Sequence, residues 1–310
     1  MNFLSMHYFI TLERERSFTK AANELHITQQ TLSANIAGIE EELNCKLFIR
    51  QIPLKLTYAG KVFLDYALDF QRKYTDMTQE FYDISNSQRG VLKIGVGYTR
   101  GRTILPQLIS EFQKKYPNIE IQLFEATNIV LHQILLKGEV DLAIANFPKN
   151  LPKVELKDFY EEEVVFVISK ELIRNLYGFD SSAIIDKIEK DGDFSKLANC
   201  PFLLTSKEDV SGRIGRELLS KADFKPIVKA QSSSVDTLLE LCVRNVGACF
   251  LPEKLLLASL TENELENLEI IHFKKDSTYM IRFGWLKHSY SWSMITRFMD
   301  FAYEILNKDS

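Results

Sequence analysis

Hydrogen-bonding side chains of short and medium length gather at residues 28–35, where a helix is predicted to begin. Glutamine and asparagine amides can pair with two atoms of an adenine edge, and serine or threonine hydroxyls can bond to bases or phosphates. Helices that enter the DNA major groove contact bases near their N-terminal end. The sequence therefore predicts a DNA-contacting face formed by Gln29, Gln30, Thr31, Ser33, Ala34 and Asn35. The alternative is a helix with an ordinary solvated polar face.

A second group of side chains, most of them polar, follows predicted strands. Ligands of open α/β sheets settle at the carboxyl ends of strands, where hydroxyls and amides near helix starts can hold an anion. Arg100 and Arg102 would add positive charge. We expect a small polar effector that carries a carboxylate, with ordinary helix capping as the alternative for each residue. The candidates are Thr99, Arg100, Thr103, Thr127, Asn128, Asn146, Phe147, Thr205, Ser206, Ser232 and Ser233.

Residue patterns typical of enzymes do not occur in the sequence. It contains no Gly-rich phosphate loop, no HExxH pair and no G-x-S-x-G turn, and its five histidines are scattered. The acidic run 161–163 is expected to be a solvated edge. Cys200, Cys242 and Cys249 are expected to be small buried residues, with a redox-sensing pair as the alternative. We predict no enzyme, no cofactor and no bound metal.

Three short helices must position the DNA-contacting side chains. Apolar residues recur at helical spacing over 3–12. Ser17 and Thr28 are predicted N-caps of the next two helices, because their hydroxyls can accept from free backbone N–H groups. Ala21 and Ala22 are small enough to let two helices cross closely. This arrangement is typical of a helix-turn-helix, and the alternative is an ordinary three-helix module.

Residues 1–60 resemble the DNA-binding domain of the LysR-type transcriptional regulators. The family pattern S-F-T-x-A-A-x-x-L-x-[IV]-[ST]-Q-x-x-L-S-x-x-I-x-x-[LI]-E is matched from Ser17 to Glu40. Its continuation, L-x-x-x-L-F-x-R and then L-T-x-A-G, is matched from Leu43 to Gly60. The resemblance implies a winged helix-turn-helix whose further DNA-contacting residues are Ser17, Thr19, Thr28, Arg50 and Lys55.

The match has three departures. Gln30 stands where the family usually has proline, and Ala34 and Ala37 stand where a basic residue is frequent. The wing between Arg50 and Leu56 is one residue shorter than is common. The two alanines leave less positive charge on the expected DNA surface than the family usually has.

A long helix without glycine or proline is predicted over residues 61–87. Large apolar residues recur about every 3.5 residues, the spacing of a coiled-coil seam. LysR-type regulators dimerise through this helix, so the resemblance implies two recognition helices held at a fixed separation. The alternative is a single helix that lies on its own domain. The seam residues are Phe63, Tyr66, Phe70, Tyr74, Met77, Phe81 and Ile84.

From residue 90 onward, predicted strands alternate with helices, as in an α/β domain with a parallel sheet. Strands are predicted at 91–97, 119–126, 140–146, 163–170, 201–205, 226–231, 247–252 and 280–286, and helices at 104–116, 130–136, 212–221, 235–244 and 292–306. This order resembles the periplasmic-binding-protein-like effector domain of the same family, with a crossing segment near 160–168. Residues 171–196 are longer than the usual connection, and a surface helix is the default expectation there.

The predicted architecture is α/β with an all-α N-terminal part. It comprises a winged helix-turn-helix domain (1–60), a linker helix with a hinge (61–89) and a two-lobed effector domain (90–310). Lobe I is expected at about 90–162 and 268–310, and lobe II at about 163–267. We expect a cytoplasmic, sequence-specific transcriptional regulator, with a two-lobed small-molecule binding protein without a transcriptional role as the alternative.

The expected partners follow from this architecture. They are double-stranded promoter DNA, further copies of the chain as a dimer or tetramer, a small effector and, as a candidate, RNA polymerase. The 310 residues carry a formal charge of −4, whereas residues 1–60 hold six basic and six acidic side chains. Because phosphate neutralisation drives much of DNA affinity, one domain alone should bind weakly. No secretion signal or long apolar run is seen, so no membrane partner is expected.

Overall fold

A computed structural model describes the chain except residues 52, 86–88, 274–276, 288–291 and 309–310 and the side chains of Gln79, Ile84, Asn307 and Lys308. The chain divides into two compact units. The first is Met1–Gly90 with a short segment that ends at Ser293, and the second is Val91–Lys287 with the segment that starts at Met294. Among the described residues, no helix combines the length and the apolar character needed to cross a bilayer.

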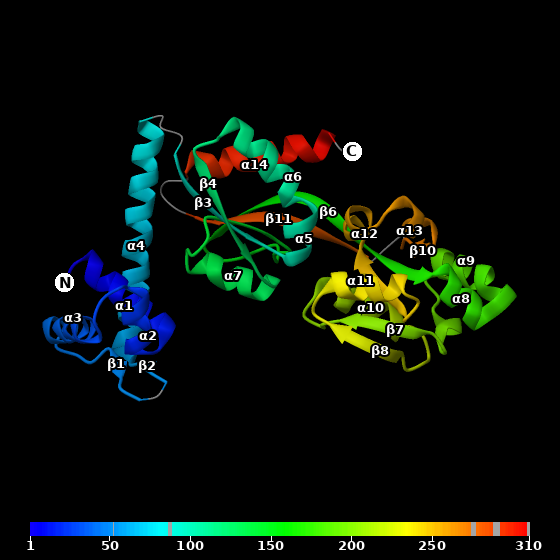
Figure 1. Ribbon diagram of the computed structural model, residues 1–310, viewed down its shortest axis with the longest axis horizontal. Coiled ribbons are helices and arrows are strands. Elements are labelled where there is room, and N and C mark those ends of the chain that lie inside the picture. Colours follow the sequence, from blue (N-terminus) through cyan, green and yellow to red (C-terminus); the bar gives the residue numbers. More distant parts are fainter. Residues whose placement is uncertain (52, 86–88, 274–276, 288–291, 309–310) are drawn as a thin grey trace. The chain divides into compact units, whose positions relative to one another are not determined.

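The first unit consists of three short helices, a two-stranded wing and a long helix (Figure 1). Phe9 on the first helix packs against Phe48 of the wing and Phe63 of the long helix, at ring-centroid distances of 4.9 and 4.6 Å. The first helix therefore anchors both the wing and the start of the linker. The elements are α1 (Phe3–Glu15), α2 (Phe18–Glu24), α3 (Gln29–Glu42), β1 (Phe48–Ile49), β2 (Lys55–Leu56) and α4 (Tyr58–Ile84).

Side-chain caps set the starts of these helices. Ser17 Oγ accepts a hydrogen bond from the Lys20 N–H at 3.4 Å, and Thr28 Oγ1 accepts one from the Thr31 N–H at 3.1 Å. Both predicted N-caps are thereby confirmed. The linker helix begins at Tyr58, earlier than the predicted residue 61, because the hydroxyl of Thr57 caps it.

The second unit contains a sheet in the order β4-β3-β5-β11-β6-β9-β7-β8, with β10 beside β6. Strands β3 and β5 are parallel, as are β7, β8 and β9, whereas β6, β10 and β11 run antiparallel to their partners. The predicted parallel pairing thus holds for β3 with β5 and for β7 with β8 and β9, whereas β6, β10 and β11 add antiparallel pairs in both lobes. The strands are β3 (Gly90–Val96), β4 (Ile119–Glu125), β5 (Leu142–Ala145), β6 (Val154–Ser169), β7 (Pro201–Thr205), β8 (Ile227–Ser232), β9 (Ala248–Pro252), β10 (Leu268–Ile271) and β11 (Thr278–Leu286).

The long strand β6 joins the two lobes. It begins at Val154 rather than at the predicted residue 163, because its first half pairs with β11 from Val154 to Glu163. Its second half pairs with β9 and β10. Figure 1 shows β6 and β11 running from one lobe into the other. The assignment of 268–271 to lobe I is wrong, since β10 pairs with β6 over Phe166–Ser169, within lobe II.

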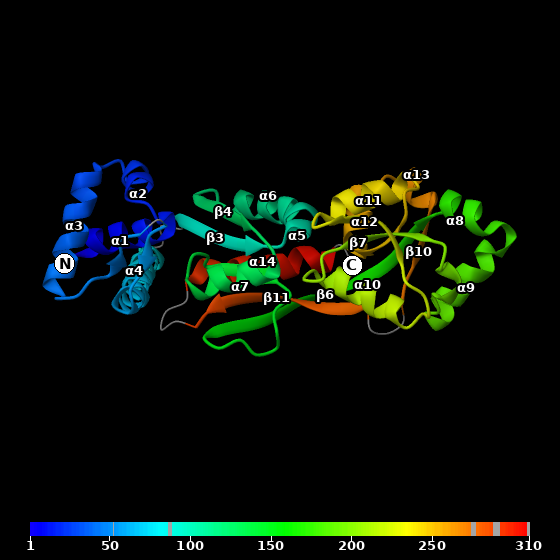
Figure 2. The same ribbon diagram turned by 90° about the horizontal axis from the view of Figure 1, so that it is seen from below.

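Helices cover both faces of the lobe I strands. Helices α6 and α14 lie on one face, where Phe112 and Phe298 meet at 5.1 Å, and α7 lies on the other (Figures 1 and 2). The helices of this unit are α5 (Tyr98–Thr103), α6 (Leu105–Lys115), α7 (Asn128–Leu136), α8 (Lys170–Tyr177), α9 (Ser181–Asp191), α10 (Val210–Ser220), α11 (Val235–Val243), α12 (Glu253–Ser259), α13 (Glu262–Glu266) and α14 (Ser293–Lys308).

The unusual segment 171–196 forms most of α8 and all of α9. Its residues Ile173, Ile184, Ile188 and Phe194 are buried in the lobe II core. The segment therefore closes one side of that core instead of lying loosely on its surface.

Candidate functional sites

The predicted DNA-contacting face lies at the start of α3. Gln29, Gln30, Thr31 and Ala34 are exposed, whereas Leu32 beneath them is buried in the core of the first unit. The tight turn before the helix holds His26 at a φ of 54°, a left-handed conformation. Burial of Leu32 fixes the rotation of α3, so one edge of its first two turns remains open to a partner.

Several predicted DNA contacts also hold the motif together. Ser17 and Thr28 cap helices, and both Ser33 and Asn35 are half-buried. The Thr19 hydroxyl lies 3.4 Å from Gln29 Oε1, which links α2 to the start of α3.

The wing carries its two bases where its strands meet the connecting loop. Lys55 on β2 pairs across the hairpin with Ile49, and Arg50 follows β1 directly. Both bases are exposed, and neither forms an ion pair with any residue that the structure describes. Both are free to meet phosphate.

Glu40 connects the recognition helix to this wing. Its carboxylate accepts from the backbone N–H groups of Leu47 (2.9 Å) and Phe48 (3.4 Å) and from Lys46 Nζ (2.7 Å). Burial alone would raise the pKa of Glu40, but these hydrogen bonds outweigh it and lower the pKa. This anchor was not among the predicted site residues, although Glu40 ends the matched family pattern.

The linker helix carries an exposed apolar face. Tyr66, Phe70, Tyr74, Met77 and Phe81 are exposed by 44–65%. Phe63 was predicted in the same seam, and that prediction is wrong. It is 8% exposed, because its ring packs on Phe9 within its own unit. The side chain of Ile84 lies outside the described residues.

The strand-end residues of the effector domain do not form one site. Arg100 is 6% exposed and lies where the lobes meet, within side-chain hydrogen-bonding range of Tyr279 on β11. Its charge acts on Tyr160 and Glu162, both on β6. Thr99 and Thr103 are half-buried on the same short helix, α5.

Glu162 overturns the expectation of a solvated acidic edge. It is 2% exposed, and its Oε2 accepts from the Tyr160 hydroxyl at 3.1 Å. Burial raises the pKa of Glu162, while the positive charge of Arg100 and the Tyr160 hydrogen bond oppose this rise. Sequence reasoning missed Tyr160, Glu162 and Tyr279, because nothing local shows that β6 is covered on that face.

Two predicted effector residues have structural roles instead. The Asn146 side chain donates to the Met280 carbonyl at 3.0 Å. Phe147 is 2% exposed, because its ring stacks on His132 and lies over Gly284, where a β-carbon would be 2.8 Å from it. Phe147 is therefore a core residue and was wrongly predicted to face a ligand.

The remaining predicted residues are spread over both lobes. Asn128 Oδ1 accepts from the Asn146 N–H at 3.3 Å, and Thr127 is exposed at the start of α7. Ser206, Ser232 and Ser233 line a groove of about 900 Å³ beside α10 and β8. Thr205 is 3% exposed, and its hydroxyl finds no hydrogen-bond partner in the described part of the chain.

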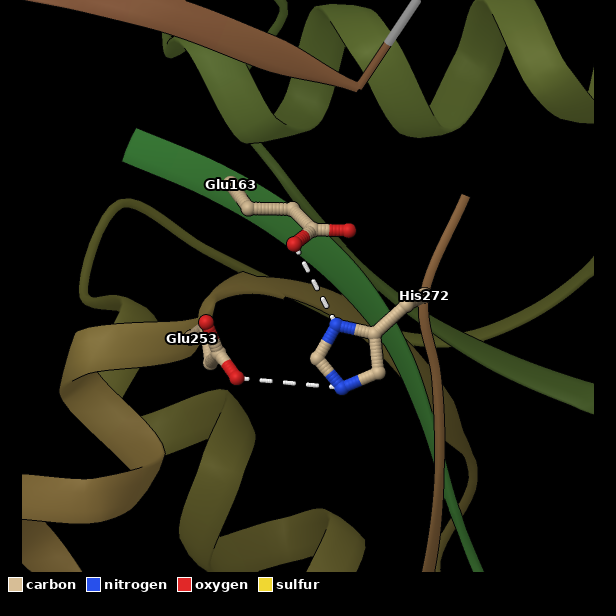
Figure 3. Close-up of side chains that lie close together, drawn as sticks. All are labelled: Glu163, Glu253 and His272. Atoms are coloured by element: carbon tan, nitrogen blue, oxygen red, sulfur yellow. Dashed lines mark hydrogen bonds and ion pairs between the residues drawn. The ribbon is translucent and has the colours of Figure 1, made fainter. Parts of the chain in front are cut away.

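A second ionisable cluster lies on the opposite side of β6. Figure 3 shows His272 between Glu163 on β6 and Glu253 at the start of α12. Nδ1 is 3.2 Å from the Glu163 carboxylate, and Nε2 is 3.7 Å from that of Glu253. A metal ion needs its ligands to converge on one point. Because the carboxylates face different ring nitrogens, the imidazole is placed as a bridge between β6 and α12.

The cysteines of lobe II are buried together. Burial raises the pKa of the Cys200 thiol to about 12 and that of Cys249 well above its usual value. Thiolates are the reactive form of cysteine. The three side chains Cys200, Cys242 and Cys249 therefore behave as small apolar residues, which favours the first of the two sequence interpretations.

Two family models match the chain. Residues 3–61 match the bacterial regulatory helix-turn-helix protein, lysR family, and residues 85–306 match the LysR substrate binding domain. The HTH-type transcriptional regulator YcgK of Bacillus subtilis is 31% identical over 260 residues, which cover 81% of this chain and 80% of that protein.

Solved structures share the fold. Full-length OxyR from Pseudomonas aeruginosa, at 19% identity, aligns with a TM-score of 0.68 over 98% of this chain and 95% of its own. CbnR in complex with its target DNA, at 18% identity, aligns with a TM-score of 0.61 over 98% and 99% of the two chains. The two family models together span the helix-turn-helix and the two-lobed domain, so the alternative of a binding protein without a transcriptional role does not hold. The chain belongs to the LysR family of DNA-binding transcriptional regulators.

Proposed function

We propose that this regulator is controlled by a small polar effector that carries a carboxylate and binds where the two lobes meet. The observation that carries the proposal is the burial of Arg100, whose Nε has no hydrogen-bond partner among the described residues. A buried guanidinium N–H group is rarely left without an acceptor. An effector carboxylate would supply one.

A ligand bound at the lobe junction could also change how the two lobes are arranged. Arg102 on α5 forms an ion pair with Asp236 at the start of α11, which links lobe I to lobe II. A ligand that binds one lobe arrangement more tightly than another shifts the population toward it. Such a shift is the means by which the effector would alter DNA binding.

We further propose that DNA is contacted by the exposed start of α3 and by Arg50 and Lys55, while Ser17 and Thr28 act through helix capping and backbone position. The face of α4 defined by Tyr66, Phe70, Tyr74, Met77 and Phe81 would join two copies. CbnR, which has the same fold, is known in complex with its target DNA. RNA polymerase is a candidate partner at the promoter.

A fluorescence anisotropy titration tests the regulatory proposal. The full chain is titrated onto a labelled fragment from upstream of its own gene, with and without small carboxylic acids. A specific, salt-sensitive complex whose affinity or stoichiometry changes with one of the acids supports the proposal. DNA binding that no acid alters, together with no acid-dependent thermal shift, contradicts the effector part alone.

A further inference from the structure

Two oppositely charged side chains are buried within range of each other's charge at the lobe junction. Arg100 comes from α5 and is 6% exposed, and Glu162 comes from β6 and is 2% exposed. The charge of each acts on the other, yet no hydrogen bond between them is formed in the structure. Each lies beside a tyrosine instead: Glu162 accepts from the Tyr160 hydroxyl at 3.1 Å, and the Arg100 guanidinium lies within side-chain hydrogen-bonding range of Tyr279.

The pair leaves specific atoms unused. Within the described part of the chain, neither Arg100 Nε nor Glu162 Oε1 has a hydrogen-bond partner, although both atoms are buried. A buried polar atom without a partner costs about 1–3 kcal/mol, and more when it is charged. One unsatisfied donor and one unsatisfied acceptor, of opposite charge, therefore lie in the same buried region.

Two further charges of opposite sign act on this region. Lys254 lies over the Tyr160 ring, 5.3 Å from its centroid, and its charge acts on Glu162. Asp209 acts on Tyr279 from the lobe II side. Lys254 and Asp209 thus add one positive and one negative charge to those of Arg100 and Glu162. A ligand with only a carboxylate would add an uncompensated negative charge beside buried Glu162, which is costly.

Resting on the effector site proposed above, we infer that the natural effector is a zwitterion of the amino acid class. Its carboxylate would accept from Arg100, and its ammonium group would donate to Glu162. This binding satisfies both unused atoms and leaves the local charge unchanged. Tyr160 and Tyr279 also bring aromatic rings close to Glu162 and Arg100, which suits the apolar part of such a ligand.

Isothermal titration calorimetry on the full chain tests the inference with matched probes. The probes are the proteinogenic L-amino acids, their 2-oxo acids, which lack the ammonium group, and their amides, which lack the carboxylate. At least one amino acid is expected to bind about tenfold or more tightly than its own 2-oxo acid and amide, equivalent to about 1.4 kcal/mol.

Three variants assign the selectivity to named atoms. Glu162→Gln should weaken amino acid binding about tenfold while leaving 2-oxo acid binding equal or stronger, so that the ratio collapses. Arg100→Gln should weaken the binding of both amino acids and 2-oxo acids. Glu161→Gln is the matched control, because Glu161 lies next on the same strand but is exposed. Glu161→Gln should leave the affinity for both amino acids and 2-oxo acids unchanged. Circular dichroism and ligand-free DNA binding show whether each variant is folded.

The possible results separate this inference from the proposed function. Tighter binding of 2-oxo acids than of amino acids by the wild-type chain overturns the zwitterion but supports a carboxylate effector. Amino acid binding that Glu162→Gln does not weaken, or amides that bind as tightly as the amino acids, also overturns the zwitterion. If neither class of acid binds, both proposals fail.

Discussion

A β-carbon on Gly97 would lie 2.7 Å from Nη2 of Arg100, so the buried guanidinium occupies the space that a side chain at residue 97 would need. The backbone of Gly97, at φ −70° and ψ 142°, is one that alanine also adopts. The close contact is with the end of a long side chain. A substitution at Gly97 would therefore displace the Arg100 side chain and leave the backbone fold unchanged.

Gly97→Ala should accordingly separate ligand binding from stability. We expect unfolding free energy to change by no more than about 1 kcal/mol, and affinity for a carboxylate-bearing ligand to fall about tenfold. Calorimetry and urea unfolding measure the two effects. Gly38→Ala in α3 is the control, since a β-carbon there meets nothing within 4 Å. Unchanged ligand affinity in Gly97→Ala would remove Arg100 from the effector site.

Glu40 should make the first unit sensitive to acid. Its pKa is lowered in the folded state, since hydrogen bonds from Lys46 and from two backbone N–H groups outweigh the effect of burial. A lowered folded pKa means that the stabilisation is present above the unfolded value of about 4.3 and is lost as pH falls through the folded value.

Glu40→Gln tests this assignment. It keeps the shape but should cost about 1–3 kcal/mol at neutral pH and flatten the acid dependence. Urea unfolding of the full chain between pH 3 and pH 7, followed by a probe in the first unit, gives both quantities. Lys46→Met is the informative partner, because it removes one of the three hydrogen bonds and leaves the carboxylate. If Glu40→Gln and the wild type showed the same acid dependence, the loss of stability at low pH would come from other groups.

The exposed glutamines of α3 should determine sequence preference. Gln29→Ala and Gln30→Ala are each expected to cost about 1–3 kcal/mol on the preferred site and little on unrelated DNA. Lys55→Ala in the wing should instead weaken all sequences alike and reduce the salt dependence of binding. Competition anisotropy with specific and random duplexes separates the two behaviours. An equal loss on every duplex for a glutamine variant would identify a phosphate contact.

The lobe II thiols should resist modification in the folded chain. Burial raises the pKa values of Cys200 and Cys249, and all three lobe II cysteines are buried, whereas Cys45 is half-buried. With an aromatic disulfide reagent at neutral pH, one thiol should react in minutes and three only on unfolding. Cys45→Ser should abolish the early reaction. Rapid reaction of a second thiol would restore the redox alternative.

Local chemistry predicted the three short helices, and the resemblance to the LysR-type regulators decided for a helix-turn-helix over an ordinary three-helix module. The caps at Ser17 and Thr28 and the small residues that let α2 and α3 cross all act within a few positions of one another. Helix periodicity and hydroxyl caps are properties of short segments, so the sequence displays them directly.

The candidate effector site shows where such reasoning ends. Glu162 looks like one of three solvated acids until β11, more than 110 positions later, pairs with that stretch of β6 and brings Tyr279 opposite Glu162. Phe147 follows a strand end as predicted, but its ring packs into the core, in the space that a side chain at Gly284 would occupy. Side-chain direction at these positions is set by partners distant in sequence, and strand alternation alone does not identify the covered face.

Charge placed on the exposed face of α4 should test its role between copies. Phe70→Glu and Phe81→Glu are expected to shift the full chain toward monomer, because burying a carboxylate opposite an apolar partner costs several kcal/mol. Thr75→Glu is the matched control, since residue 75 is exposed and lies about 140° around the helix from residue 70 at 3.6 residues per turn. Light scattering after size-exclusion chromatography gives the mass at several concentrations. DNA affinity should fall with the mass, because one domain with balanced charge binds weakly alone. A wild-type monomer, or glutamate variants that keep the wild-type mass, would show that this face does not join two copies.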